Sequence, residues 1–202
     1  MDNNITCYTK QTFRMTKNFI ISTLIFCLTT ICSCGQRLKS TSGKFLDFLN
    51  NYQTDSLSVL LADSFHLQRT YTTYTNDKTS FIDEYVPNSK NLNGKYKVLK
   101  ATYNELTAEF LVEDQSDYYK YLNVDSPKWK IILTTNNQDK IMSMTIDTTE
   151  SYQSYLLQIK QKDEDFESWL KTNYPNETKD ALYSTTGLLT RRLKEYAKKH
   201  IR

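Results

Sequence analysis

The segment from Lys95 to Thr148 constrains the fold more than any other part of the 202-residue chain. Five runs rich in strand-forming residues follow one another in it: Tyr96–Tyr103, Leu106–Glu113, Asp117–Val124, Lys128–Thr135 and Lys140–Asp147. Two to four polar residues separate each run from the next. Such short connections join antiparallel neighbours, because a parallel return requires a crossover of about a dozen residues or more. The segment therefore predicts an antiparallel meander.

Helical periodicity precedes this segment. Apolar residues spaced three and four apart predict two helices, and an alternating run and a short helix follow them. The four expected elements are the helices Phe45–Tyr52 and Leu57–Phe65, a strand His66–Tyr74 and a helix Thr79–Tyr85. We expect the last helix to end at Pro87, because proline interrupts a helix.

Helical periodicity returns after Thr148. Apolar stripes predict helices over residues 152–170, and a last helix from about Thr178 contains Gly187 as a weak point. Helices followed by a meander are typical of the α+β class. We expect N-terminal helices packed on a strongly curved antiparallel sheet of five to six strands, with a helical extension at the C-terminus.

The residues from about Lys44 to Thr148 resemble the nuclear-transport-factor-2-like (NTF2-like, or SnoaL-like) family. The resemblance rests on the N-terminal helix pair, the strand that it leads into, the short helix Thr79–Tyr85 and the closing hairpin from Trp129 to Ile141. It implies helices packed into the concave side of the sheet around a cone-shaped pocket. It also implies that two copies of the chain can pair through their sheets.

The stretch Met15–Cys34 indicates export. One positive charge, Lys17, precedes an apolar run from Phe19 to Ile31, which is short for a bilayer span of about 20 residues. The last four residues, Ile-Cys-Ser-Cys, resemble the lipobox of bacterial lipoproteins, which implies cleavage before Cys34 and lipid attachment to its sulfur. An ordinary cleaved signal and a membrane helix are the alternatives.

These features predict four parts of the chain. They are a signal peptide over residues 1–33, a lipid-anchored tether over 34–43, an NTF2-like domain over 44–148 and a helical extension over 149–202. For the signal peptide we favour Met15 as the true start. The expected location is the bacterial cell envelope, at the outer membrane or the cell surface. Membrane lipid, held through Cys34, is the expected anchor.

The cysteine and glycine positions restrict the chemistry of the mature domain. All four cysteines lie at or before the proposed cleavage site: Cys7, Cys27, Cys32 and Cys34. This placement excludes disulfides, cysteine zinc sites and thiol nucleophiles after Cys34. Glycines only at 35, 43, 94 and 187 exclude a glycine-rich phosphate loop, and no His-Glu-x-x-His zinc motif is present. We expect no cofactor and no metal.

The last dozen residues, Arg191 to Arg202, carry six positive charges and one negative charge. A basic tail can bind anionic phosphate or lipid headgroups. Because cations are also favoured at the C-terminus of a helix, we interpret it as the solvated end of a terminal helix. It lacks interleaved stacking aromatics on a matching sheet, which a nucleic-acid site would need, and we expect no nucleic-acid partner.

A catalytic pocket of this family would require a carboxylate on the apolar face of a strand. Glu109 and Glu113 alternate with apolar residues and are expected to face water, and Asp147 is expected to cap the next helix. Tyr52 could stabilise an oxyanion, but no base accompanies it. His66 has no identifiable partner. The sequence therefore favours a non-catalytic domain.

Five residues are predicted to line the pocket: Tyr52, Arg69, Tyr71, Phe110 and Trp129. Arg69 is the one charged residue placed where a pocket could bind an acidic group. We expect a lipoprotein domain that binds a small apolar ligand or an envelope protein, and pairing of two copies is a further expectation. The alternative is a small isomerase or dehydratase that acts in the same pocket.

Overall fold

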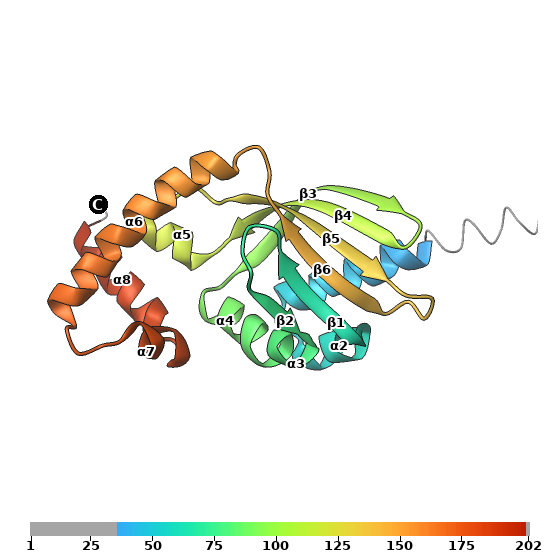
Figure 1. Cartoon of the computed structure of the whole chain (residues 1–202), viewed down its shortest axis with the longest axis horizontal. Helices are drawn as coiled ribbons and strands as arrows, with labels where there is room; N and C mark the ends of the chain where they lie inside the picture. Colours follow the sequence, from blue (N-terminus) through green and yellow to red (C-terminus); the bar gives the residue numbers. More distant parts are fainter. Residues whose placement is uncertain (1–35, 201–202) are drawn as a thin grey trace, which may run out of the picture. The chain divides into compact units, whose positions relative to one another are not determined.

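The computed structural model describes residues 36–200, of which residues 38–200 belong to one compact unit. At its centre is a six-stranded sheet with the strand order β2-β1-β6-β5-β4-β3 (Figure 1). The strands are β1 (Leu61–Arg69), β2 (Thr75–Asp77), β3 (Lys95–Asn104), β4 (Thr107–Gln115), β5 (Lys128–Thr135) and β6 (Ile141–Asp147).

Helices precede, interrupt and follow this sheet. The chain is helical over residues 36–50, and one π-helical segment, η1, lies between two α-helices. The other elements are α2 (Thr54–Leu60), α3 (Lys78–Ser80), η1 (Phe81–Tyr85), α4 (Val86–Asn91), α5 (Asp117–Leu122), α6 (Tyr152–Asn173), α7 (Lys179–Ser184) and α8 (Leu188–His200). This arrangement confirms the α+β class.

The sheet is mixed and not wholly antiparallel. Strands β3 to β6 pair antiparallel with their sequence neighbours, as predicted. Strand β1, however, runs parallel to β6, with Leu67 opposite Met144. The prediction of an antiparallel sheet is wrong at this pair, because the long connection between β1 and β6 leaves ample chain for a parallel return.

The main core lies between the sheet and the N-terminal helices. Alternate residues of the central strands face it, among them Val112 of β4 and Ile131 and Leu133 of β5, all fully buried. Phe45, from the helix over residues 36–50, contributes a ring whose centroid lies 6.1 Å from that of Phe81 in η1. Each such side chain contributes about 1.5–3 kcal/mol of burial free energy, which holds helices and sheet together.

The first elements begin and end earlier than predicted. Residues 36–43, expected as part of a tether, are helical, and Leu38 is buried there. Helix α2 ends at Leu60, and the strand begins at Leu61, where the prediction continued the helix to Phe65. The pairing of β1 with β6 shifts register between Leu61 and His66. This irregularity places two buried residues four apart, which imitates a helical period.

Helix formation continues through Pro87, contrary to the prediction. Pro87 lies in the first turn of α4, and the helix extends to Asn91. The π-helical segment η1 precedes α4 directly, so the hydrogen-bond pattern of the helix is already irregular where the proline enters it. The helical stretch from Lys78 to Asn91 therefore lies beside the open end of the sheet, where it forms one wall of a large cavity.

The predicted strand Asp117–Val124 is helix α5. Its first turn is capped by Ser116, whose hydroxyl accepts a hydrogen bond from the N–H of Tyr118 at 3.1 Å. Asn123 ends it in the left-handed conformation, with φ of 54°. The prediction was wrong because three tyrosines, which favour strands, were given more weight than these two capping signals.

Helices α5 to α8 pack together at one end of the sheet (Figure 1). The predicted last helix is two helices, because Gly187 adopts φ of 73° between α7 and α8. A second core joins them, formed by Leu122, Val124, Ile159, Phe166, Trp169, Leu182, Leu193 and Tyr196. No helix within residues 36–200 is both long and apolar enough to span a bilayer.

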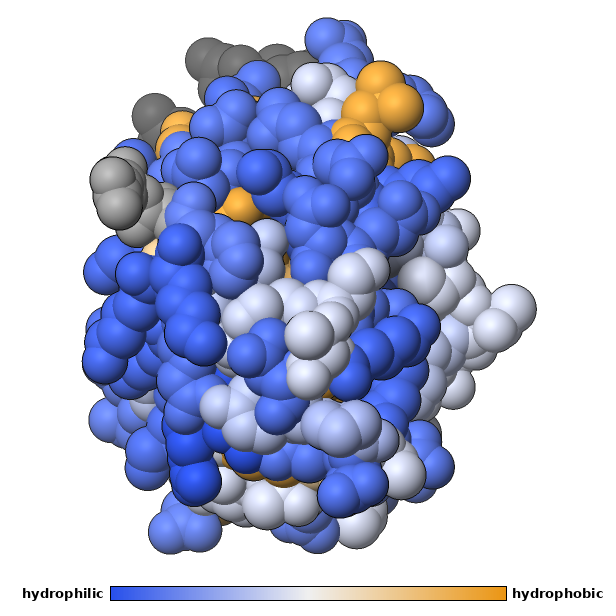
Figure 2. All heavy atoms as spheres, turned by 90° about the vertical axis from the view of Figure 1, so that its left-hand side faces the viewer, coloured by the Kyte–Doolittle hydropathy of each residue, from blue (hydrophilic) through white to orange (hydrophobic). Residues whose placement is uncertain are grey.

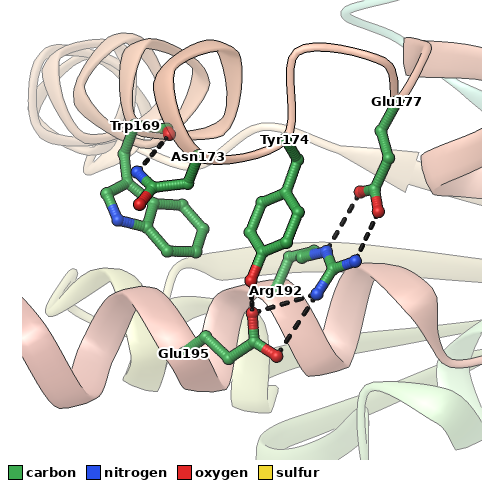
Figure 3. A network of polar contacts seen from close by, with 6 residues as sticks. All are labelled: Trp169, Asn173, Tyr174, Glu177, Arg192 and Glu195. Carbon is green, nitrogen blue, oxygen red and sulfur yellow. Dashed lines mark hydrogen bonds and ion pairs between the residues drawn. The ribbon is translucent and has the colours of Figure 1, made fainter.

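Arg192 ties the end of the chain to the loop after α6 (Figure 3). Its Nε donates to Glu177 at 3.0 Å, its Nη1 donates to Glu195 at 3.0 Å, and its guanidinium lies 3.5 Å from the ring centroid of Tyr174. One of the six positive charges of the basic tail is therefore neutralised internally. The face shown in Figure 2, over the C-terminal helices, is largely hydrophilic with scattered apolar spheres.

Candidate active site

A cavity of about 780 Å³ lies where the open end of the sheet meets α4, α5 and α6. Side chains from both the sheet domain and the C-terminal helices line it, and most of the large ones are aromatic. Its volume lies within the range of about 300–1,000 Å³ that small-molecule sites occupy. The helical extension is therefore part of the pocket wall.

Asp114 is a half-buried carboxyl group in this wall. Its Oδ2 accepts a hydrogen bond from the Tyr119 hydroxyl at 3.1 Å and from the Trp129 indole N–H at 3.3 Å. Burial raises the pKa of Asp114 to about 6, although these two donors and the positive charge of Arg69 oppose the shift. A carboxyl with this pKa can accept or donate a proton near neutral pH.

The position of Asp114 follows from the alternation of β4. Ala108, Phe110 and Val112 are buried on one face of the strand, and Asp114 is the next residue on that face. Its own N–H donates to the carbonyl of Pro127 at 2.8 Å, which fixes the end of the strand. Sequence reasoning missed this residue because it ended the strand at Glu113. The signal was present, since Asp114 continues the buried series at period two.

Tyr85 and Tyr96 form a pair of hydroxyl groups in the same wall. Their oxygens lie 2.7 Å apart, and either can be the donor. Burial raises the pKa of both, so both stay protonated at neutral pH. Asn50 fixes Tyr96 from the first helix, because its side-chain amide accepts from the Tyr96 N–H at 2.8 Å and donates to the Tyr96 carbonyl at 2.9 Å.

Tyr155 of α6 packs against the residues around Asp114. Its ring lies edge-on to that of Tyr119, with centroids 6.0 Å apart, and the Tyr119 hydroxyl donates to Asp114. Burial raises the pKa of Tyr155 to about 12. These contacts therefore join β4, α5 and the C-terminal extension around the Asp114 carboxyl.

Three of the five predicted pocket residues line this cavity: Arg69, Tyr71 and Trp129. The rings of Tyr71 and Trp129 stack with centroids 4.9 Å apart. The cavity therefore brings together residues from β1, from the loop after it and from β5.

Tyr52 and Phe110 lie outside the lining of this cavity. The Tyr52 hydroxyl donates to the carbonyl of Gly94 at 3.0 Å, which ties the first helix to the turn before β3. Phe110 is buried in the core, with its ring edge toward Tyr103 at 5.9 Å. Phe110 precedes Asp114 by four residues, which places it about 13 Å farther along the strand.

The other acidic and histidine candidates lie outside the cavity lining. Glu109 is exposed, and Glu113 pairs with Lys97 at 3.6 Å. Asp147 accepts from the Thr70 hydroxyl at 2.6 Å, and α6 begins only at Tyr152, so Asp147 does not cap it. His66 is exposed. Among the residues that the structure describes, no three His, Cys, Asp or Glu side chains group to hold a metal ion.

No protein-family model matches the sequence, and no curated protein sequence matches it either. Solved structures share its fold. An NTF2-like protein from Cytophaga hutchinsonii ATCC 33406 is 12% identical with a TM-score of 0.43, over 54% of this chain and 87% of that chain. A protein from Kribbella flavida DSM 17836 assigned to the ketosteroid isomerases is 13% identical with a TM-score of 0.48, over 58% and 82%. An M. tuberculosis LEH-like epoxide hydrolase is 9% identical with a TM-score of 0.48, over 65% and 93%.

One of these structures is thus described as an NTF2-like protein, and the likeness concerns the fold alone. The prediction of a non-catalytic binding domain is wrong. Its premise was that no carboxylate shares the pocket, and Asp114 is such a carboxylate. The predicted lipid site, Cys34, and the predicted signal peptide lie outside the described residues.

Proposed function

We propose that this protein is an enzyme that moves a proton on a small, largely apolar carbonyl compound, in an isomerisation or a dehydration. The observation that carries the proposal is Asp114, a half-buried carboxyl group in the wall of a large cavity, whose pKa is raised to about 6. A general base works best when its pKa lies near the working pH, and buried carboxyls are raised toward that range.

Asp114 is the proposed base. Its Oδ2 is engaged by Tyr119 and Trp129, and no hydrogen bond within residues 36–200 engages its other oxygen, Oδ1. The carboxylate takes the proton from the carbon next to the substrate carbonyl, and the electron pair moves onto the carbonyl oxygen to form an enolate. In an isomerisation of a β,γ-unsaturated carbonyl compound, Asp114 returns the proton to the γ carbon of the dienolate, and the double bond moves into conjugation with the re-formed carbonyl. In a dehydration of a β-hydroxy carbonyl compound, Asp114 gives the proton to the departing β-hydroxyl, which leaves as water while the carbonyl and an α,β double bond form.

Tyr85 and Tyr96 are the proposed donors to the enolate oxygen. Because one hydroxyl donates to the other, the second keeps its proton free for the substrate. Both lie in a buried setting that raises their pKa, so they stay protonated and can donate. Donors held in place in a site of low dielectric stabilise developing negative charge more than water does, by about 3–4 kcal/mol per donor in well-studied sites.

Aromatic rings form the remainder of the proposed substrate site. Tyr71, Trp129 and Tyr152 contact one another with centroids 4.9 to 5.8 Å apart. Their flat faces offer an apolar surface to the substrate, and each tyrosine adds a polar end. This wall supports a substrate with rings or an extended apolar part.

Deuterium exchange tests the proposal with simple model compounds in place of the natural substrate. Small ketones and unsaturated ketones are incubated in D2O with the protein, and exchange at the carbon next to the carbonyl is followed by NMR. We expect exchange above the buffer rate, and Asp114→Asn lowers it by about a hundredfold or more, as the loss of a general base does.

Glu113→Gln is the matched control. Glu113 precedes Asp114 on the same strand, but its side chain lies on the opposite face and pairs with Lys97. The control variant keeps the wild-type exchange rate. Equal rates for wild type and Asp114→Asn, or no exchange above buffer with any of these compounds, contradict the proposal.

We further propose that the enzyme is a bacterial lipoprotein anchored to a membrane of the cell envelope through Cys34. The support is the order of Lys17, the apolar run Phe19–Ile31 and the sequence Ile-Cys-Ser-Cys that ends at Cys34. One acyl chain binds a membrane only reversibly, so the anchor requires at least two. Mass spectrometry of the N-terminal peptide tests this, because an unmodified Cys34 or cleavage elsewhere contradicts it, and Cys34→Ser releases the protein from the membrane fraction.

A further inference from the structure

Arg69 lies at the C-terminal end of β1, in the wall of the cavity. Its guanidinium carbon is 5.6 Å from the ring centroid of Tyr74 and 5.4 Å from that of Tyr85. A guanidinium stacks on aromatic rings through its flat face, which leaves its N–H groups at the edge free to donate. The two rings therefore orient the Arg69 cation within the cavity wall.

The Nη1 atom of Arg69 is buried and has no hydrogen-bond partner within residues 36–200. A buried charged donor without an acceptor is costly, and proteins normally match such groups with an anion or several hydrogen bonds. The side chain therefore has an unmatched donor within the cavity wall, and an anionic acceptor would match its charge.

The carboxyl groups of the cavity wall have other donors. Asp114 accepts from Tyr119 and Trp129, and Asp163 accepts from the hydroxyl of Tyr118. Glu84 lies 3.5 Å from the hydroxyl of Tyr74. Arg69 is the one lysine or arginine among the described residues that line the cavity. An anionic group that enters the cavity is therefore attracted to Arg69.

We propose that Arg69 binds the carboxylate of the substrate, and that the substrate class is aromatic or largely apolar carboxylic acids. The planar guanidinium presents two parallel N–H groups, which match the two oxygens of a carboxylate. The stacked rings of Tyr71 and Trp129 hold the apolar part of the acid. The choice of substrate class rests on the proposed proton transfer at Asp114, whereas the binding of a carboxylate does not.

Calorimetric titration with two closely matched compounds tests this binding. 2-Naphthylacetate and 2-naphthylacetamide share the same apolar rings and differ in the charge of one terminal group. A hydrogen bond between charged partners contributes more binding free energy than one to a neutral amide. We therefore expect the wild-type protein to bind the acid about tenfold or more tightly than the amide. In Arg69→Met the acid loses this advantage, and the affinity for the amide is unchanged.

Three further variants test whether the preference for the acid comes from Arg69 itself or from other charges of the protein. Lys97→Met removes a cation outside the cavity, paired with Glu113, and keeps the preference for the acid. Arg69→Lys keeps the charge without the planar fork and retains part of the preference, which tests the site even where Arg69→Met does not fold. Asp114→Asn binds the acid at least as tightly as wild type, because a neighbouring negative charge is removed.

Equal affinities of wild type for acid and amide overturn the proposal, as does loss of the preference in Lys97→Met. These results leave the proton-transfer proposal standing. If the acid is preferred through Arg69 but wild type and Asp114→Asn show the same deuterium exchange, the carboxylate site stands and the proposed reaction fails. The two proposals are thus refuted by different measurements.

Discussion

Replacement of Asp114 by Asn makes the stability of the protein less sensitive to pH. The pKa of this carboxyl rises from 3.8 in the unfolded chain to about 6 in the folded protein, and burial is the main cause. Between these two values the folded state holds a proton that the unfolded state has released. Folding therefore loses free energy as pH rises through this window, and the loss is complete above the folded pKa.

The magnitude follows from the size of the shift. A difference of about two pKa units corresponds to about 3 kcal/mol, at 1.36 kcal/mol per unit, and about 2 kcal/mol of it falls between roughly pH 4 and pH 7.5. The asparagine has no charge to lose. The unfolding free energy of the Asp114→Asn variant, measured relative to that of wild type, should therefore rise by about 2 kcal/mol between roughly pH 4 and pH 7.5.

Urea unfolding of both proteins at several pH values, followed by tryptophan fluorescence, measures this difference. The contributions of other titrating groups cancel in the comparison when they do not contact residue 114. Glu113→Gln is the control with the opposite sign, because the pKa of Glu113 is lowered by Gln115 and Lys97 and its charge favours the folded state. A stability difference between wild type and Asp114→Asn that stays flat with pH refutes a raised pKa at Asp114, and with it the argument for a base at neutral pH.

Three further predictions concern activity, packing and the C-terminal helices. The exchange activity depends on ionised Asp114, so kcat/KM rises about tenfold per pH unit up to about pH 6 and then levels off; a rate that falls as pH rises through 6 contradicts this. Leu133→Ala in the core costs about 2–5 kcal/mol in urea unfolding, whereas Leu99→Ala, at a strand position 41% exposed, costs below about 1 kcal/mol; equal costs would show that the core is misplaced. Arg192→Gln removes the two ion pairs of a side chain that is only 11% exposed, and we expect faster amide hydrogen exchange in α8 and in the loop after α6. Arg191→Gln, at an exposed position, should leave the hydrogen-exchange rates unchanged. Unchanged exchange in Arg192→Gln would mean that the apolar contacts of α8 suffice.

Sequence patterns predicted the central strands well because one face of each is buried. Strand β5 has the predicted bounds, Lys128–Thr135, and the alternation of Trp129, Ile131 and Leu133 with polar neighbours is its clear signal. Period-two alternation of this kind arises from local geometry together with burial, and both are visible in the sequence.

The candidate site was harder to predict because it lies where elements end and distant elements meet. Asp114 is one residue beyond the predicted end of its strand, and an error of one residue removed the carboxylate from consideration. Its partner Tyr119 belongs to a segment predicted as a strand, where its side chain would point elsewhere. Tyr155 contacts the Tyr119 ring from α6, and only tertiary packing brings it there.

The parallel pairing of β1 with β6 also determines the order in which the domain can fold. Among the described strands, β1 has only β2 and β6 as neighbours, and β6 is the last strand of the sheet. A chain that emerges with its N-terminus first leaves the edge of β1 that pairs with β6 without its partner until β6 is available. The hairpins of β3 to β6 close short loops and can form at once, whereas β1 must close a long one. Any partner that shields residues 61–69 during synthesis or export would therefore act on the last step of folding.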